Sequence, residues 1–374
     1  MNIFFFLKPI ADLLYQYQVL DYLLTAWCIV FLIKEKSNRL CSIDYCVIAL
    51  MGIFFLSFLR NTDGWSILLK IESGFLLYFL GREYYRYWGE ITASLQWGFL
   101  VVFLVSVMAF VSGHGFQSWG THNTFTSFYY FKTDAAYAFS QCFIFFSIGY
   151  STCRYKNWVL VLCVLMTFFT NARAHYFIIF ILSALYGKYW KDTQCGMNHL
   201  TINYKLFLSG VFIVFVLLII LNYLSAYIGD RYLLFQFDSL SDLMNGANTQ
   251  GRSDIWQIVY KKFNQNDFFT RLIGLDLVSA TAKVNGKFWS AHNMYIKILY
   301  SIGYMGSAVY GIFIFQTFCF LNRLRARRLF YIALGLLVTF LVSGLSCVSI
   351  EDVQRSWLPM FYIGVAVSKV RTYK

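Results

Sequence analysis

Charged residues are scarce in this sequence: aspartate, glutamate, lysine and arginine make up 13% of its 374 residues. Soluble domains carry about 25%, so the composition excludes an ordinary soluble domain. Hydrophobic residues make up 59% and aromatic residues 21%. Apolar runs recur along the chain, and a helical run of about 20 residues matches the thickness of a bilayer core. The composition therefore predicts a polytopic α-helical membrane protein.

Several motifs of well-known enzymes and transporters are also missing. The sequence has no G-x-x-x-x-G-K-[ST] loop, so an ATP-driven mechanism is not supported. It has no Asp-x-Asp pair for a metal-bound nucleotide sugar and no His-Glu-x-x-His motif. Its two prolines, Pro9 and Pro359, and the lack of a detectable repeat do not fit the paired interrupted helices of many transporters. We expect a protein that uses neither a metal nor another cofactor.

Eleven apolar runs are predicted as membrane spans, which gives an all-α fold with about 11 transmembrane helices (10–12). The spans cover residues 17–33, 43–59, 65–81, 91–112, 134–151, 158–171, 175–188, 206–228, 294–320, 329–347 and 356–370. Residues 2–16 are expected to lie at the membrane interface. Residues 1–374 are expected to form one membrane domain, interrupted by one long loop over 229–291.

Lysine and arginine are unevenly shared between alternate loops. One set of loops is rich in them, with Lys34, Lys36, Arg39, Arg82, Arg86, Arg154, Lys156, Lys188, Lys191, Lys205, Arg323, Arg325, Arg327, Arg328, Lys369, Arg371 and Lys374. The short loops of the other set hold only Arg60, Lys132, Arg173 and Arg355. The positive-inside rule places the first set in the cytoplasm and the 229–291 loop outside. The net charge of +13 is then a topology signal, and nucleic acid is not an expected partner.

Two arginines on the predicted outer side are candidates for binding phosphate. Arg173 lies with His175 in the short turn of a predicted helical hairpin, and Arg252 precedes an amphipathic helix that Ser253 is expected to cap. A guanidinium binds phosphate through two parallel hydrogen bonds, and a helix N-terminus favours anions. We expect the apolar side of this helix to lie on the membrane surface. The alternatives are a snorkelling Arg173 and a solvated Arg252.

The same side carries a histidine and an acidic turn. His292 and Asn293 directly precede a long apolar run. Histidine exchanges a proton near neutral pH, so His292 could act as a general base, or it could be a structural or capping residue. The last outer turn holds Glu351, Asp352 and Arg355. A carboxylate there could orient His292 or bind a sugar hydroxyl; a solvated acidic turn is the alternative.

The order of these motifs resembles that of the O-antigen polymerase/O-antigen ligase superfamily. The resemblance covers roughly residues 165–310 and rests on Arg173, Gly251, Arg252, Trp256, His292, Asn293, Gly303 and Gly306. It implies a GT-C-like glycosyltransferase of the bacterial inner membrane, with its active site facing the periplasm. It also implies a donor glycan on undecaprenyl pyrophosphate, with Arg173 and Arg252 as pyrophosphate binders and His292 as base or positioning group.

We expect further substrate contacts from Asn293, Trp256, Glu351, Asp352, Arg355 and His175. The superfamily usually has Ser/Thr-Arg-Gly where this chain has Ala172-Arg173-Ala174, and it often has a proline after the amphipathic helix. These departures favour a repeat-unit polymerase over an O-antigen ligase, which remains an alternative. A lipid-linked oligosaccharide flippase or other transporter is a third reading, because Lys70, Glu72 and Lys297 fall in predicted spans. The expected partners are the lipid-linked glycan, the bilayer and a chain-length regulator.

Overall fold

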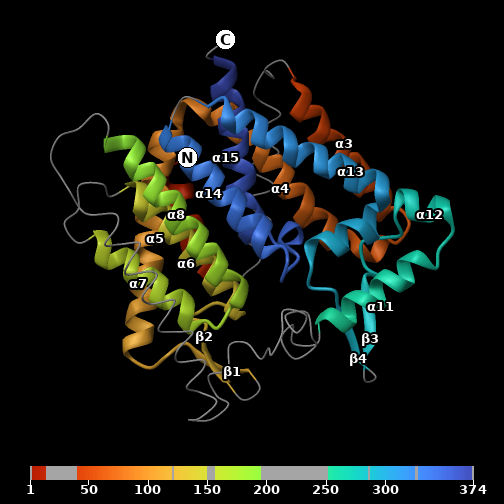
Figure 1. The fold of residues 1–374 in the computed structure, drawn as a ribbon, viewed down its shortest axis with the longest axis horizontal. Helices are drawn as coiled ribbons and strands as arrows, with labels where there is room; N and C mark the ends of the chain where they lie inside the picture. The colour runs from red at the N-terminus through yellow and green to blue at the C-terminus, as the bar shows by residue number, and fades with distance from the viewer. Residues whose placement is uncertain are drawn as a thin grey trace. The chain divides into compact units, whose positions relative to one another are not determined.

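The computed structural model describes residues 2–13, 40–119, 122–149, 156–194, 252–284, 287–324 and 327–372. The chain is mostly helical (Figure 1). The helices are α1 (Asn2–Leu13), α3 (Ser42–Phe58), α4 (Trp65–Glu83), α5 (Trp88–Val111), α6 (Lys132–Gly149), α7 (Lys156–Phe169), α8 (Arg173–Gln194), α11 (Arg252–Asn264), α12 (Phe268–Ile273), α13 (Met294–Asn322), α14 (Arg327–Ser343) and α15 (Val353–Thr372). Nine predicted spans coincide with helices, while 17–33 and 206–228 lie outside the described residues.

Two β-hairpins were not predicted. One pairs β1 (Phe116–Trp119) with β2 (His122–Phe125), and the other pairs β3 (Thr281–Val284) with β4 (Lys287–Ser290). Each strand has four residues, too few for alternation of apolar and polar side chains to stand out in the sequence. Short 3₁₀ turns, η1 (Thr62–Gly64), η2 (Tyr84–Tyr87) and η5 (Ser349–Glu351), adjoin α4 and α15.

Two helical stretches in the described part of the chain are long and apolar enough to cross a membrane. They are Thr62–Val111, which runs through α4 and α5, and Met294–Asn322. Shorter apolar helices cover Ser42–Phe58, Lys156–Phe169 and Arg328–Ser343. The structure thus supports a helical chain with long apolar helices, and the count of about 11 spans stays a prediction.

The chain divides into two compact units. Unit 1 holds residues 1–22, 86–234 and 325–343, and unit 2 holds residues 23–85, 235–324 and 344–374. Among the described elements, unit 1 therefore contains α1, α5–α8, α14 and the first hairpin. Unit 2 contains α3, α4, α11–α13, α15 and the second hairpin. The expectation of a single membrane domain stays a prediction.

In unit 1, the predicted tight hairpin of two helices is present. The turn between α7 and α8 has three residues, 170–172, and Asn171 adopts a left-handed φ of 52° there. The first helix, α1, packs along α5, where Gly98 allows close approach: a Cβ at Gly98 would lie 2.4 Å from the Phe6 carbonyl oxygen. This packing buries Phe5 and Lys8 of the segment that was expected at the membrane interface.

In unit 2, α4 and α15 are packed backbone to backbone. A Cβ at Gly81 would lie 2.0 Å from the carbonyl oxygen of Phe361, and a Cβ at Gly364 would lie 2.0 Å from that of Tyr78. Small residues allow this close approach, which is common between membrane helices. The pair fixes α15, whose N-terminal end carries Arg355.

The long helix α13 is kinked at Gly303, which has a φ of 67°. The kink frees carbonyl groups that other segments bind: Leu275 N–H donates to Tyr300 at 2.8 Å, and Ser57 Oγ donates to Ser301 at 2.8 Å. Gly274 faces the kink so closely that a Cβ at Gly303 would lie 2.3 Å from its nitrogen. The glycine therefore ties the loop after α12 to the helix that follows His292.

Candidate functional site

The helix α11 starts two residues earlier than expected. It begins at Arg252, so Ser253 lies within the first turn and does not occupy the predicted N-cap position. The Arg252 guanidinium is partly buried, and its Nη1 donates a 3.0 Å hydrogen bond to the carbonyl oxygen of Ser346. One of its five N–H donors is thus engaged by the protein.

The apolar side of α11 is covered by protein rather than left free for a membrane surface. Ile255, Val259 and Phe263 are buried against the second hairpin and Tyr300 of α13. Ile258, another apolar residue of α11, is 40% exposed. The expectation of an amphipathic helix is confirmed, but its apolar side packs on the hairpin and α13.

The helix cap of α13 is Asn293, not His292. The Asn293 side-chain oxygen accepts hydrogen bonds from the backbone N–H groups of Tyr295 at 3.0 Å and Ile296 at 3.1 Å. Asn293 is buried, whereas His292 is exposed and has a left-handed φ of 43°. The capping alternative for His292 is therefore wrong, and its imidazole remains accessible.

The turn between α14 and α15 brings these segments together. The carbonyls of Gly344, Leu345 and Ser346 accept in turn from the Met294 backbone, the Asn293 side chain and Arg252. The three distances are 2.7, 3.3 and 3.0 Å. The turn residues were not predicted as part of the site, since nothing in their sequence marks a carbonyl as an acceptor.

His292 lies within electrostatic reach of two arginines. Loss of solvent on its protein side, and then the positive charges of Arg252 and Arg355, lower the pKa of His292 below its ordinary value. Burial also lowers the pKa of Arg252; the charge of Arg355 lowers it further, whereas Cys347 opposes the shift. His292 is therefore held neutral at pH 7, the form that can accept a proton.

Both carboxylates of the last turn are paired with cations. Asp352 lies 3.2 Å from Arg355 Nε, and Glu351 lies 3.2 Å from Lys297 Nζ. Burial raises the pKa of Glu351, while Lys297 and Lys70 oppose that rise. The side chains of Asp352 and Glu351 are 22% and 19% exposed, so the alternative of a solvated acidic turn is wrong.

Two of the predicted site residues, Arg173 and His175, belong to unit 1. Arg173 is the first residue of α8 and is partly buried. His175 is fully buried, and its Nδ1 lies 3.2 Å from Ser140 Oγ on α6. This burial favours a structural role for His175 over contact with a substrate.

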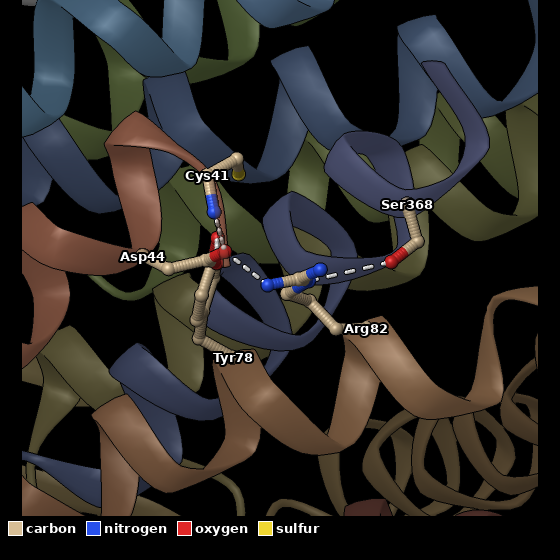
Figure 2. A network of polar contacts seen from close by, with 5 residues as sticks. All are labelled: Cys41, Asp44, Tyr78, Arg82 and Ser368. Atoms are coloured by element: carbon tan, nitrogen blue, oxygen red, sulfur yellow. Dashed lines mark hydrogen bonds and ion pairs between the residues drawn. The ribbon is translucent and has the colours of Figure 1, made fainter. Parts of the chain in front are cut away.

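A polar network in unit 2 was missed from the sequence (Figure 2). Arg82, which was assigned to a cytoplasmic loop, is buried in α4 and forms an ion pair with the buried Asp44 of α3. Asp44 also accepts hydrogen bonds of 2.6 Å from Tyr78 OH and from the Cys41 backbone, while Arg82 Nε lies 3.5 Å from Ser368 Oγ. The signal that could have identified this network is Asp44, a lone acidic residue at the start of an apolar run.

A second loop assignment also changes. Lys156 is buried at the start of α7, with its ammonium group 5.0 and 5.1 Å from the ring centroids of Tyr186 and Trp190. Aromatic faces attract cations, so this lysine packs within unit 1. Arg82 and Lys156 show that not every basic residue assigned to the cytoplasmic loops is solvated.

The described residues contain no group of three or more His, Cys, Asp or Glu side chains that could hold a metal ion. Chemistry without a metal stays a prediction. No protein-family model matches the chain, and no curated protein matches it significantly in sequence.

Proposed function

We propose that the protein is a bacterial inner-membrane glycosyltransferase that polymerises oligosaccharide repeat units carried on undecaprenyl pyrophosphate. The observation that carries the proposal is the cluster of Arg252, Arg355 and His292, in which two guanidinium groups lie within electrostatic reach of an accessible neutral imidazole. The resemblance to the O-antigen polymerase/ligase superfamily supplies the reaction.

Charge supports an anionic ligand. Four cations, Arg252, Arg355, Lys297 and Lys70, share this end of unit 2 with the two carboxylates Glu351 and Asp352. The excess is positive, and Arg252 keeps N–H donors beyond the one bound to Ser346. A pyrophosphate group offers the negative charge and the acceptor oxygens that such a cluster favours.

The apolar surface supports a membrane setting. Large apolar side chains stay exposed along the long helices, including Met108 at 66% on α5 and Phe315 at 68% on α13. A helix that is apolar on both its packed and its exposed sides fits a lipid environment. The predicted orientation would place the cluster at the periplasmic face.

In the proposed reaction, each of these groups has a role. The acceptor sugar hydroxyl transfers its proton to the neutral imidazole of His292 as its oxygen bonds to the donor anomeric carbon. The bond from that carbon to the pyrophosphate oxygen breaks, and undecaprenyl pyrophosphate leaves with the electron pair. Arg252, supported by the charge of Arg355, stabilises the developing negative charge. Arg173 stays predicted as a second pyrophosphate-binding arginine.

The transporter alternative loses part of its support. Lys297, one of the charges that suggested ion coupling, is buried between Glu351 and the carbonyl oxygen of Leu277. The positive charge of Lys70 also stabilises the carboxylate form of Glu351. Lys297 and Lys70 therefore belong to the polar cluster at the start of α15 rather than to a separate path for ions.

Deletion of the gene tests the proposal. A strain that lacks the enzyme should make surface polysaccharide with a single repeat unit, seen as the loss of the ladder on a gel. Restoration by the wild-type gene is the control. Complete polymer that fails to reach the lipid A core would instead identify a ligase, and lipid-linked units trapped inside the cell would identify a flippase.

A further inference from the structure

Trp256 links α11 to the backbone beside His292. Its indole N–H donates a 2.6 Å hydrogen bond to the carbonyl oxygen of Ala291. Ala291 is completely buried, and its own N–H donates to the Ala280 carbonyl at 3.3 Å. The residue just before His292 is therefore bound from both of its backbone groups.

The residue after His292 is fixed as firmly. Asn293 caps α13 through its side-chain oxygen and donates through its side-chain nitrogen to Leu345. His292 alone of the three is exposed, and its left-handed backbone is disfavoured for a residue with a Cβ. Such a conformation persists where the neighbours determine it. The buried residues Ala291 and Asn293 thus hold the backbone in place on both sides of the exposed His292 imidazole.

We propose that Trp256 is a positioning residue for His292, which rests on the function proposed above. By holding the Ala291 carbonyl, the indole N–H keeps the imidazole beside Arg252 and Arg355, where it faces the acceptor hydroxyl. In this role Trp256 acts through the backbone of Ala291, whereas the sequence-based expectation was a contact with the substrate.

The packing of α11 separates this role from general stability. Ile255, Val259 and Phe263 form the buried side of the helix, whereas Trp256 packs at the edge of that cluster and is partly exposed. Loss of the indole N–H should therefore leave the helix in place. It should release the Ala291 carbonyl, so the imidazole can move away from the two arginines.

The test compares full-length Trp256→Phe with a protein that carries a tryptophan analogue at position 256, in which sulfur replaces the indole N–H. The analogue keeps the ring shape, so it remains informative if Trp256→Phe folds poorly. We expect kcat for polymerisation of lipid-linked repeat units to fall about 10- to 100-fold, because small misplacements of a catalytic group have effects of this size. The KM for the donor should not change. Trp65→Phe removes an exposed indole at the start of α4 and is the control.

A second readout does not depend on activity. NMR titration of labelled histidine follows His292, whose signal is assigned by its loss in His292→Gln. In the wild type its pKa should lie below the ordinary value. In both Trp256 variants the pKa should rise toward that value, because the imidazole regains solvent and moves away from the two arginines.

The outcomes separate the two ideas. An unchanged titration, or a raised KM with unchanged kcat, would overturn the positioning role; the second result would make the indole a substrate contact. A wild-type protein that does not polymerise would overturn the proposed function, while the titration would still test the link from Trp256 to His292.

Discussion

The two ends of α15 lie beside polar clusters of opposite character. Toward its C-terminal end, Arg82 and Asp44 form a buried pair of equal and opposite charges, with Ser368 of α15 beside the guanidinium (Figure 2). At its N-terminal end, Arg355 stands near Arg252 and the exposed His292. The first cluster is balanced and closed to solvent, whereas the second has excess positive charge and an accessible titratable group.

The difference between the two clusters gives a physical criterion for telling a structural charge pair from charges that favour a ligand. A buried charge is costly unless it is paired, so a balanced buried pair needs no ligand to explain it. Like charges held close together cost free energy unless a ligand or partner compensates them. In the N-terminal cluster Asp352 compensates the charge of Arg355, while Arg252 adds a second positive charge beside it. Perturbed titratable groups of this kind concentrate at functional sites.

The largest effect is expected at His292. His292→Ala should slow polymerisation by about 10²- to 10⁴-fold, the usual loss when a general base is removed. His292→Gln can still hydrogen-bond but cannot take up a proton near pH 7. Rates measured with purified lipid-linked repeat units separate the two roles. Near wild-type activity of His292→Gln would reject the base. His114→Gln, at an exposed histidine of unit 1, is the control.

The closed cluster should respond in stability rather than in chemistry. Asp44→Asn removes the carboxylate that pairs with the buried Arg82, and the loss of one partner of a buried pair costs about 3–5 kcal/mol. We expect a lower melting temperature in detergent and near-normal activity per folded molecule. Replacing both residues, as Asp44→Asn with Arg82→Gln, should recover part of the loss. Asp63→Asn, at an exposed acid in η1, is the control. A melting temperature equal to wild type would show that the pair contributes little.

Arg252→Lys should have an intermediate effect on activity. Lysine keeps the charge but loses the planar pair of parallel donors with which a guanidinium binds a phosphate. Hydrogen bonds to charged groups contribute about 1.5–3 kcal/mol, which corresponds to about 10- to 100-fold in kcat/KM. Lys261→Arg, an exposed position on the same helix, is the control. Full activity of Arg252→Lys would mean that a point charge suffices.

Much of the helical framework was predictable because helices depend on patterns among residues that are close together in the sequence. Apolar runs predicted the helices, and the preference of asparagine for N-cap positions was available to identify Asn293. The contact between Arg252 and Ser346 joins residues 94 positions apart. Such contacts depend on how the helices pack, as does the pairing of Lys297 with Glu351. Local patterns could nominate the charged residues of the site but not their partners.

The smallest effect on activity is expected from Arg355→Gln. The direction in which this variant shifts the pH profile is the test. Loss of solvent and two positive charges lower the pKa of His292. Arg355→Gln removes one of those charges and leaves Asp352 without its ion-pair partner, so both changes raise that pKa. Because the base must be neutral, the acidic limb of the kcat/KM profile should move to higher pH. Lys261→Gln should not move it. A limb that stays in place, or moves to lower pH, would separate Arg355 from the titration of His292 and leave it a structural partner of Asp352.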